Sequence, residues 1–161
     1  MSNYLPFDPS QNPSKSGNDL SDVITFLHTL IQEYRSYLEL KELYAWDKLT
    51  IAGAPACCIA FDTASVSPTS LGHNCNEFRP QFNIFLYFES LTPGMDTQPH
   101  LSRLYNLMRV IYDNSSLYNL CATNPVSIEG MDLVARRIES DVYLTGQLTI
   151  VTPIRFCRTR R

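Results

Sequence analysis

The chain has no apolar run of the roughly 18 to 20 residues that a membrane-spanning helix needs, and its start is polar and rich in proline. We therefore expect a soluble protein that is made in a cytoplasm. Glycine-rich phosphate loops, HExxH metal motifs and GxSxG nucleophile motifs are also missing, and no two carboxylates recur at a fixed helical spacing. The sequence predicts no catalytic, cofactor-binding or metal-binding residue, so we expect a protein that is not an enzyme.

The cysteines form no recognisable framework. There are five of them, an odd number, and none stands in a CxxC pair: Cys57, Cys58, Cys75, Cys121 and Cys157. This usage favours reduced, mostly buried thiols over disulfides or a zinc site. His73 lies close to Cys75, but no orienting acid or oxyanion donor stands at a recognisable spacing, which makes a Cys/His nucleophile a minor alternative. His28, beside an apolar helical stripe, is interpreted as a histidine at the rim of the core.

Composition indicates a folded chain of one domain. The 161 residues are 44% hydrophobic and include nine tyrosines and eight phenylalanines, which excludes a disordered chain. The net charge of −3 gives no general attraction to nucleic acid or an anionic membrane. Basic residues gather at the end of the chain, where Arg155, Arg158, Arg160 and Arg161 predict a contact with an acidic neighbour or with DNA. The alternative is a solvated end that raises solubility.

Apolar periodicity predicts two helices and four strands. Residues 1–17, with Pro6, Pro9 and Pro13, are predicted to form an extended arm that is either a loose tail or docks on a neighbouring subunit through Tyr4 and Phe7. Residues 18–161 form the predicted domain. Its expected elements are a helix from Asn18 or Ser21 to about Leu43, a strand over 56–61, a strand over 82–89, a helix over 97–117, and strands over 126–133 and 142–151.

The predicted fold is α+β, with a mainly antiparallel four-stranded sheet, two long helices on one face and the order α-β-β-α-β-β. Residues 62–76 are expected to be a long hairpin tip or a loop. In each helix we expect one buried apolar stripe. The first stripe comprises Val23, Ile24, Leu27, Ile31, Tyr34 and Leu38, and the second comprises Leu101, Leu104, Tyr105, Met108, Ile111 and Tyr112.

The strand over 82–89 is apolar on both faces, which is unusual for a half-exposed antiparallel strand. Phe82, Ile84, Leu86 and Phe88 alternate with Asn83, Phe85 and Tyr87. The second set either completes the core of the monomer under the 62–76 segment or contacts another subunit. We take Phe85 and Tyr87, with the outward-facing Tyr143 and Gln147 of the last strand, as candidate subunit contacts.

The order of elements resembles that of tail-terminator, or tail-completion, proteins of long-tailed bacteriophages. The likeness covers about residues 20–158. It begins with the first amphipathic helix, the strand and polar segment after it, and the aromatic strand with its helix over 82–117. It continues with the Asn-Pro-Val-Ser-Ile-Glu-Gly start of the next strand and with a last strand that runs into a basic end. It is a likeness of pattern, since the family has no invariant chemical motif.

The resemblance implies a non-enzymatic virion protein of the phage tail and neck. Such subunits assemble, usually as a homohexameric ring, on the head-proximal end of the tail tube, stop its polymerisation and provide the surface for head-tail joining. The implied partners are further copies of the chain, the tail tube protein, a neck or connector protein and, if the tail is contractile, the sheath. DNA only passes through the lumen, and no cofactor is implied.

Two other functions stay open at this point. One is another neck component, such as a head-completion or connector subunit of similar size and composition. The other is a nucleic-acid-binding α+β domain whose sheet stacks bases on Phe85 and Tyr87, although the acidic balance of that region speaks against it.

Overall fold

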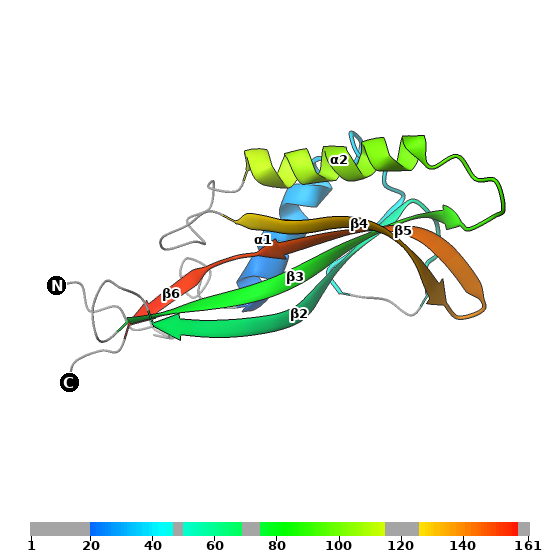
Figure 1. Ribbon diagram of the computed structural model, residues 1–161. Coiled ribbons are helices and arrows are strands. Elements are labelled where there is room, and N and C mark those ends of the chain that lie inside the picture. Colours follow the sequence, from blue (N-terminus) through cyan, green and yellow to red (C-terminus); the bar gives the residue numbers. More distant parts are fainter. Residues whose placement is uncertain (1–19, 47–49, 69–74, 115–125, 158–161) are drawn as a thin grey trace.

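The computed structural model describes residues 20–46, 50–68, 75–114 and 126–157, and the predicted arm over 1–17 lies outside them. Two helices lie on one face of a six-stranded, mainly antiparallel sheet (Figure 1). The elements in chain order are α1 Leu20–Glu33, β1 Glu42–Tyr44, β2 Ala56–Pro68, β3 Cys75–Ser90, α2 Gln98–Asp113, β4 Ser127–Ile138, β5 Asp141–Val151 and β6 Ile154–Cys157. The α+β class and the two helices are confirmed, but the sheet has six strands where four were predicted.

Helix α1 ends about ten residues before the predicted position because the chain turns back toward the sheet. After Glu33 the backbone continues in turns, and Glu39 adopts a left-handed conformation with φ 55°. Arg35 stabilises this reversal, since its Nε donates to the carbonyl of Leu40 at 3.1 Å and its Nη2 donates to the carbonyl of Lys41. The reversal leads directly into β1, whose first residues were predicted to belong to the helix.

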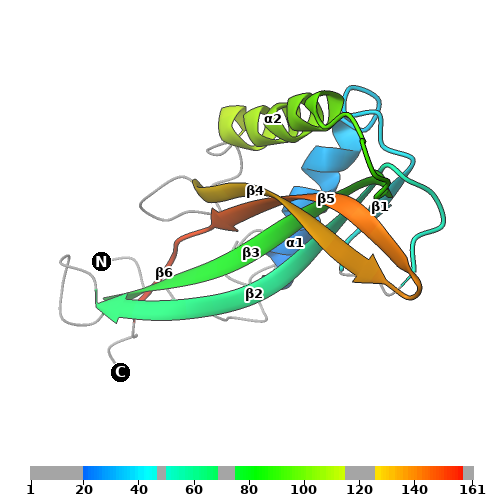
Figure 2. The same ribbon diagram turned by 45° about the vertical axis from the view of Figure 1, so that its right-hand side comes forward.

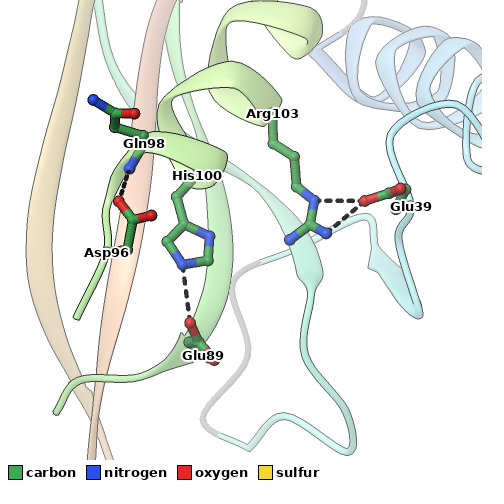
Figure 3. Close-up of polar contacts among 6 residues, drawn as sticks. All are labelled: Glu39, Glu89, Asp96, Gln98, His100 and Arg103. Atoms are coloured by element: carbon green, nitrogen blue, oxygen red, sulfur yellow. Dashed lines mark hydrogen bonds and ion pairs between the residues drawn. The ribbon is translucent and has the colours of Figure 1, made fainter.

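Helix α2 begins close to the predicted residue and is held by polar contacts at its start (Figure 3). The Asp96 carboxylate accepts a hydrogen bond from the backbone N–H of Gln98 at 3.0 Å. His100 stacks on Phe88, with ring centroids 4.6 Å apart, and its Nε2 lies 2.9 Å from Oε1 of Glu89. These contacts tie the first turn of the helix to the end of β3.

A charged contact joins α2 to the turn that follows α1. Arg103 donates from both Nε, at 3.0 Å, and Nη2, at 2.5 Å, to Oε2 of Glu39 (Figure 3). The pair lies near the surface, where ion pairs contribute about 0–1 kcal/mol. The contact links α2 to the turn that precedes β1.

The sheet is built around β3, with strand order β1-β2-β3-β5-β4. The β2–β3 and β4–β5 pairs are antiparallel hairpins, and β1 joins β2 in the only parallel pair among the described strands. Most of the 62–76 segment is strand, since β2 extends to Pro68 and β3 begins at Cys75. The predicted hairpin is thus confirmed, and a loop over the whole segment was wrong.

The last predicted strand, over 142–151, corresponds to β5 and ends as expected, but a further strand, β6, follows it. Residues Thr152 and Pro153 interrupt the pairing of β5 with β3, and the chain resumes as β6 on the same side of β3. The N–H of Thr152 donates to the carbonyl of Pro80 at 3.1 Å and bridges the interruption. Pro153 therefore ends regular pairing as predicted, but only for these two residues.

The main core lies between the helices and one face of the sheet. Phe82, Ile84, Leu86 and Phe88 of β3 all belong to it, as the alternation predicted. The helices cover the part of the sheet at this core, and the distal end of the β2–β3 hairpin projects past them with β6 alongside (Figures 1 and 2). Strands β2 and β3 thus run from the main core into the projecting hairpin.

Gly146 of β5 is required by the close packing of α2 on the sheet. A Cβ at this position would lie 2.9 Å from Cδ1 of Leu104 and 3.2 Å from Cζ of Phe88, and both neighbours are buried. We expect Gly146→Ala to lower the free energy of unfolding by about 1–3 kcal/mol through overpacking, as measured by urea denaturation.

Gly130→Ala is the matched control in the neighbouring strand. Its Cβ would meet no atom closer than 3.9 Å, and alanine restricts the unfolded chain more than glycine does. The control should be as stable as the parent or slightly more stable. Equal stability of the two variants would contradict the packing described at Gly146.

Candidate interaction surfaces

The aromatic side chains on the outer face of β3 are buried within the monomer. Phe85 is 7% exposed and Tyr87 is fully buried. With Ala56, Cys58 and Ile138 they form a second, smaller core, against which Tyr44, Ile51, Ala60 and Tyr143 pack. For these two residues the structure favours completion of the monomer core, although the cover is not the predicted 62–76 segment.

Arg136 of β4 closes this second core from the solvent side. Its guanidinium carbon lies 3.8 Å from the centroid of the Phe85 ring, a cation–π geometry. Its Nη1 also donates a hydrogen bond of 2.6 Å to the hydroxyl of Tyr87. The face of Phe85 that a nucleic-acid base would need is therefore occupied by a side chain of the same protein, which argues against base stacking there.

The other two predicted contact residues lie at the border of this cluster. Tyr143 meets Tyr87 edge to face, with centroids 6.0 Å apart, and is half-buried. Gln147 is also half-buried, and its Nε2 donates to Oδ1 of Asn83 at 3.3 Å. Both retain surface that another molecule can reach, so a subunit contact at Tyr143 and Gln147 stays a prediction. For Phe85 and Tyr87, such a contact needs the covering groups to move.

The outer face of the sheet becomes polar beyond Gln147. Asn83 Oδ1 also accepts a hydrogen bond from the hydroxyl of Thr149 at 2.9 Å, and Gln81 donates to Asp62 at 2.8 Å. These side chains satisfy one another across three strands. The outer face is thus divided into an apolar end that the chain covers and a polar end with its own hydrogen-bond network.

The predicted basic end is described only in part. Arg155 belongs to β6, where the ladder pairs it with Glu77 of β3. Arg158, Arg160 and Arg161 lie outside the described residues, as does His73 of the alternative nucleophile pair. A contact of this end with DNA or with an acidic neighbour remains a prediction.

The sheet has two edges that no described strand covers along most of their length. At one edge, β1 pairs only with residues 56–58 of β2, and β4 forms the other edge. Edge strands are usually protected by charge or irregularity. Strand β4 carries Glu129, Asp132, Arg136 and Arg137, whereas β2 has no charged residue after Asp62.

Exposed apolar side chains accompany both edges on the helix-facing side of the sheet. On β2 they are Phe61 and Val66, which are 46% and 59% exposed, and on β4 it is Met131, 43% exposed. Phe61 stands opposite the buried Phe82, and Met131 stands opposite the buried Leu148, which fixes their side of the sheet. The core face of the sheet therefore extends beyond its cover at each edge.

The predicted apolar stripe of α2 is displaced around the helix. The buried residues are His100, Leu104, Leu107, Val110 and Ile111, and the predicted Leu101, Tyr105 and Tyr112 are exposed. Helix α2 carries two adjacent apolar stripes, and the predicted stripe combined residues of both. Tyr105 of the exposed stripe lies near Tyr37 and Tyr34, which follow the end of α1, and Tyr34 was also predicted to be buried.

These exposed tyrosines line a hollow between the end of α1 and α2. Its volume is ≈ 370 Å³, and its lining residues are Tyr34, Tyr37, Tyr105, Asn106, Arg109, Val110, Asp113 and Asn114. Tyr105 and Asp113 beside Arg109 raise the pKa of its guanidinium, which stays charged in any case. Tyrosine and arginine are enriched where proteins bind proteins, so the hollow is a second candidate contact surface.

The described residues contain no arrangement suited to a metal ion, and the two adjacent cysteines of β2 are not suited to thiolate chemistry. No group of three or more His, Cys, Asp or Glu side chains among them could hold a metal ion. Cys57 and Cys58 are free and buried, as predicted. Burial, and to a lesser extent Cys58, raises the pKa of the Cys57 thiol, so it stays protonated and unreactive. Nor is any described helix long and apolar enough to span a membrane.

Comparison with protein-family models finds none that matches the chain, and comparison with curated proteins finds no significant match. Function is therefore inferred from the residues themselves.

Arg136 offers a direct test of how the second core is closed. We expect Arg136→Ala to lower the free energy of unfolding by about 1–3 kcal/mol, because Phe85 loses its cover and the buried Tyr87 hydroxyl loses a donor. Arg137→Ala, at the exposed neighbouring position, should change it by no more than about 0.5 kcal/mol. Chemical denaturation monitored by tyrosine fluorescence measures both, and equal effects would show that Arg136 is not needed as a cover.

Proposed function

We propose that the protein is a structural virion component that assembles as a ring on the tail tube of a long-tailed bacteriophage, ends the polymerisation of the tube and joins it to the head connector. The observation that carries the assembly role is the edge of β2. Among the described strands none pairs with this edge beyond residue 58, the strand has no charged residue after Asp62, and Phe61 and Val66 are exposed beside it. A strand edge of this kind is a template for pairing with another chain.

The occupant we propose for the β2 edge is the β4 edge of a second copy. The β2 edge beyond β1 and the β4 edge lie on opposite sides of the sheet, and their exposed apolar residues project from the same face. Joining them would continue the sheet from one subunit into the next and bury Val66 and Phe61 near Met131. Because the two contacting surfaces differ, the contact is head-to-tail, and repetition closes a ring when the rotation permits.

The finer assignment to a tail terminator rests on the resemblance in the order of elements. The projecting β2–β3 hairpin and the tyrosine-lined hollow supply two further surfaces, which we assign to the tube and to the neck protein. Another neck component is the second candidate, because it would use the same edges in a ring. The cover over Phe85 makes the nucleic-acid-binding domain the least favoured function.

The edge contact predicts the behaviour of charged variants. Val66→Lys on β2 and Met131→Lys on β4 should each abolish ring formation, because each places a charge in the proposed contact. Both side chains are exposed in the monomer, so stability should change by no more than about 0.5 kcal/mol. Light scattering after size-exclusion chromatography at tens of micromolar measures the assembly state.

Two controls sharpen this experiment. Leu101→Lys alters an exposed apolar residue on α2, away from both edges, and should assemble like the parent. A mixture of the two edge variants retains one intact β2 edge and one intact β4 edge, so it should form dimers and nothing larger. A parent protein that stays monomeric, even in the presence of tube ends, would contradict the proposed function.

A further inference from the structure

Two of the five cysteines are opposite each other in the backbone register of the sheet, although 81 residues separate them in the sequence. Cys75 is the first residue of β3 and Cys157 is the last residue of β6. The antiparallel register makes their Cα atoms direct partners. Three further pairs continue the ladder: Asn76 with Phe156, Glu77 with Arg155, and Phe78 with Ile154. The opposition is therefore part of a regular pairing.

This register meets the distance requirement of a disulfide. Residues directly opposite in an antiparallel pair have Cα atoms about 4.5 or 5.5 Å apart, depending on the type of pair. Disulfides usually join Cα atoms about 4.4–6.8 Å apart, so either type lies in range. The backbone register therefore places the two Cα atoms in the range of a disulfide.

We propose that Cys75 and Cys157 form a reversible disulfide that fastens β6 to the projecting end of the β2–β3 hairpin. Strand β6 has four residues and pairs with β3 alone among the described strands. A short strand held on one side frays readily, and a covalent link at its last residue would oppose this. The inference does not depend on ring formation.

The oxidant we propose is a small disulfide such as glutathione disulfide. The thiolate of one cysteine displaces one glutathione and forms a mixed disulfide; the second thiolate then attacks the protein sulfur and releases the other glutathione. Two protein thiols thus become one disulfide, and one glutathione disulfide becomes two glutathione molecules. In a reducing cytoplasm the pair is open, and in an oxidising medium it closes.

The test uses the full-length protein, reduced and then equilibrated in glutathione buffers from reducing to oxidising. After acid quenching and alkylation, mass spectrometry of the peptides identifies each linkage. We expect a Cys75–Cys157 linkage that increases with oxidation, while the buried Cys57 and Cys58 are alkylated only after unfolding. Cys121→Ser should keep the linkage, and both Cys75→Ser and Cys157→Ser should abolish it.

Hydrogen exchange provides the second readout. The amides of 154–157 should exchange more slowly in the oxidised protein than in the reduced one, with no such difference in Cys75→Ser. The proposal is overturned if Cys75 and Cys157 remain thiols or separate glutathione adducts in the most oxidising buffer, or if either pairs with Cys121 instead. It is also overturned if the linkage forms without slowing exchange in β6.

Discussion

The structure depends on the burial of β3 on both of its faces. Its alternating side chains supply the main core under α1 and α2 on one face and a second core on the other. Neither described helix covers the second face, and smaller parts of the chain cover it instead. These are the turn residues around Ile51, the β4–β5 hairpin and the guanidinium of Arg136 over Phe85. The strand needs both covers to stay in the centre of the sheet.

This arrangement concentrates the stabilising contacts at one end of the sheet. The end that holds Leu86 and Tyr87 is covered on both faces, whereas the hairpin formed by the other ends of β2 and β3 projects past the helices (Figures 1 and 2). In the part of the chain that the structure describes, no strand pairs with β2 beyond residue 58, and Phe61 and Val66 are exposed beside this edge. A subunit whose own fold is complete at one end and unpaired along its edges is suited to repeated head-to-tail contact.

The sequence predicts the parts of the fold that have a strong local period. The alternation of β3 identified its core face correctly, and the stripe of α1 identified Val23, Leu27 and Ile31 as buried. Strands β1 and β6 were not predicted because each has only three or four residues, too few to show a period, and is stabilised by pairing. β1 pairs with the next strand, β2, and β6 pairs with β3, which is distant in sequence. The two faces of α2 were confused because Leu104 and Tyr105 are both apolar, and only packing decides which one faces the sheet.

The surfaces were harder to predict than the elements. Phe85 and Tyr87 carry the sequence signal of an exposed aromatic face, yet Arg136, 51 positions after Phe85, covers them. The tyrosine-lined hollow combines residues of α2 with Tyr34 and Tyr37, and no spacing within either helix indicates that they meet. The open edges follow only from the strand order, since local periodicity does not state which strand lies outermost.

Electron microscopy of particles made without this protein tests the central claim most directly. A tail terminator limits the length of the tube and supplies the surface for the head, so its absence should leave overlong tails without heads next to free, filled heads. Restoring the intact protein should return tails of uniform length, and the Val66→Lys variant should not. Tails of normal length, joined to heads in the absence of the protein, would contradict the account.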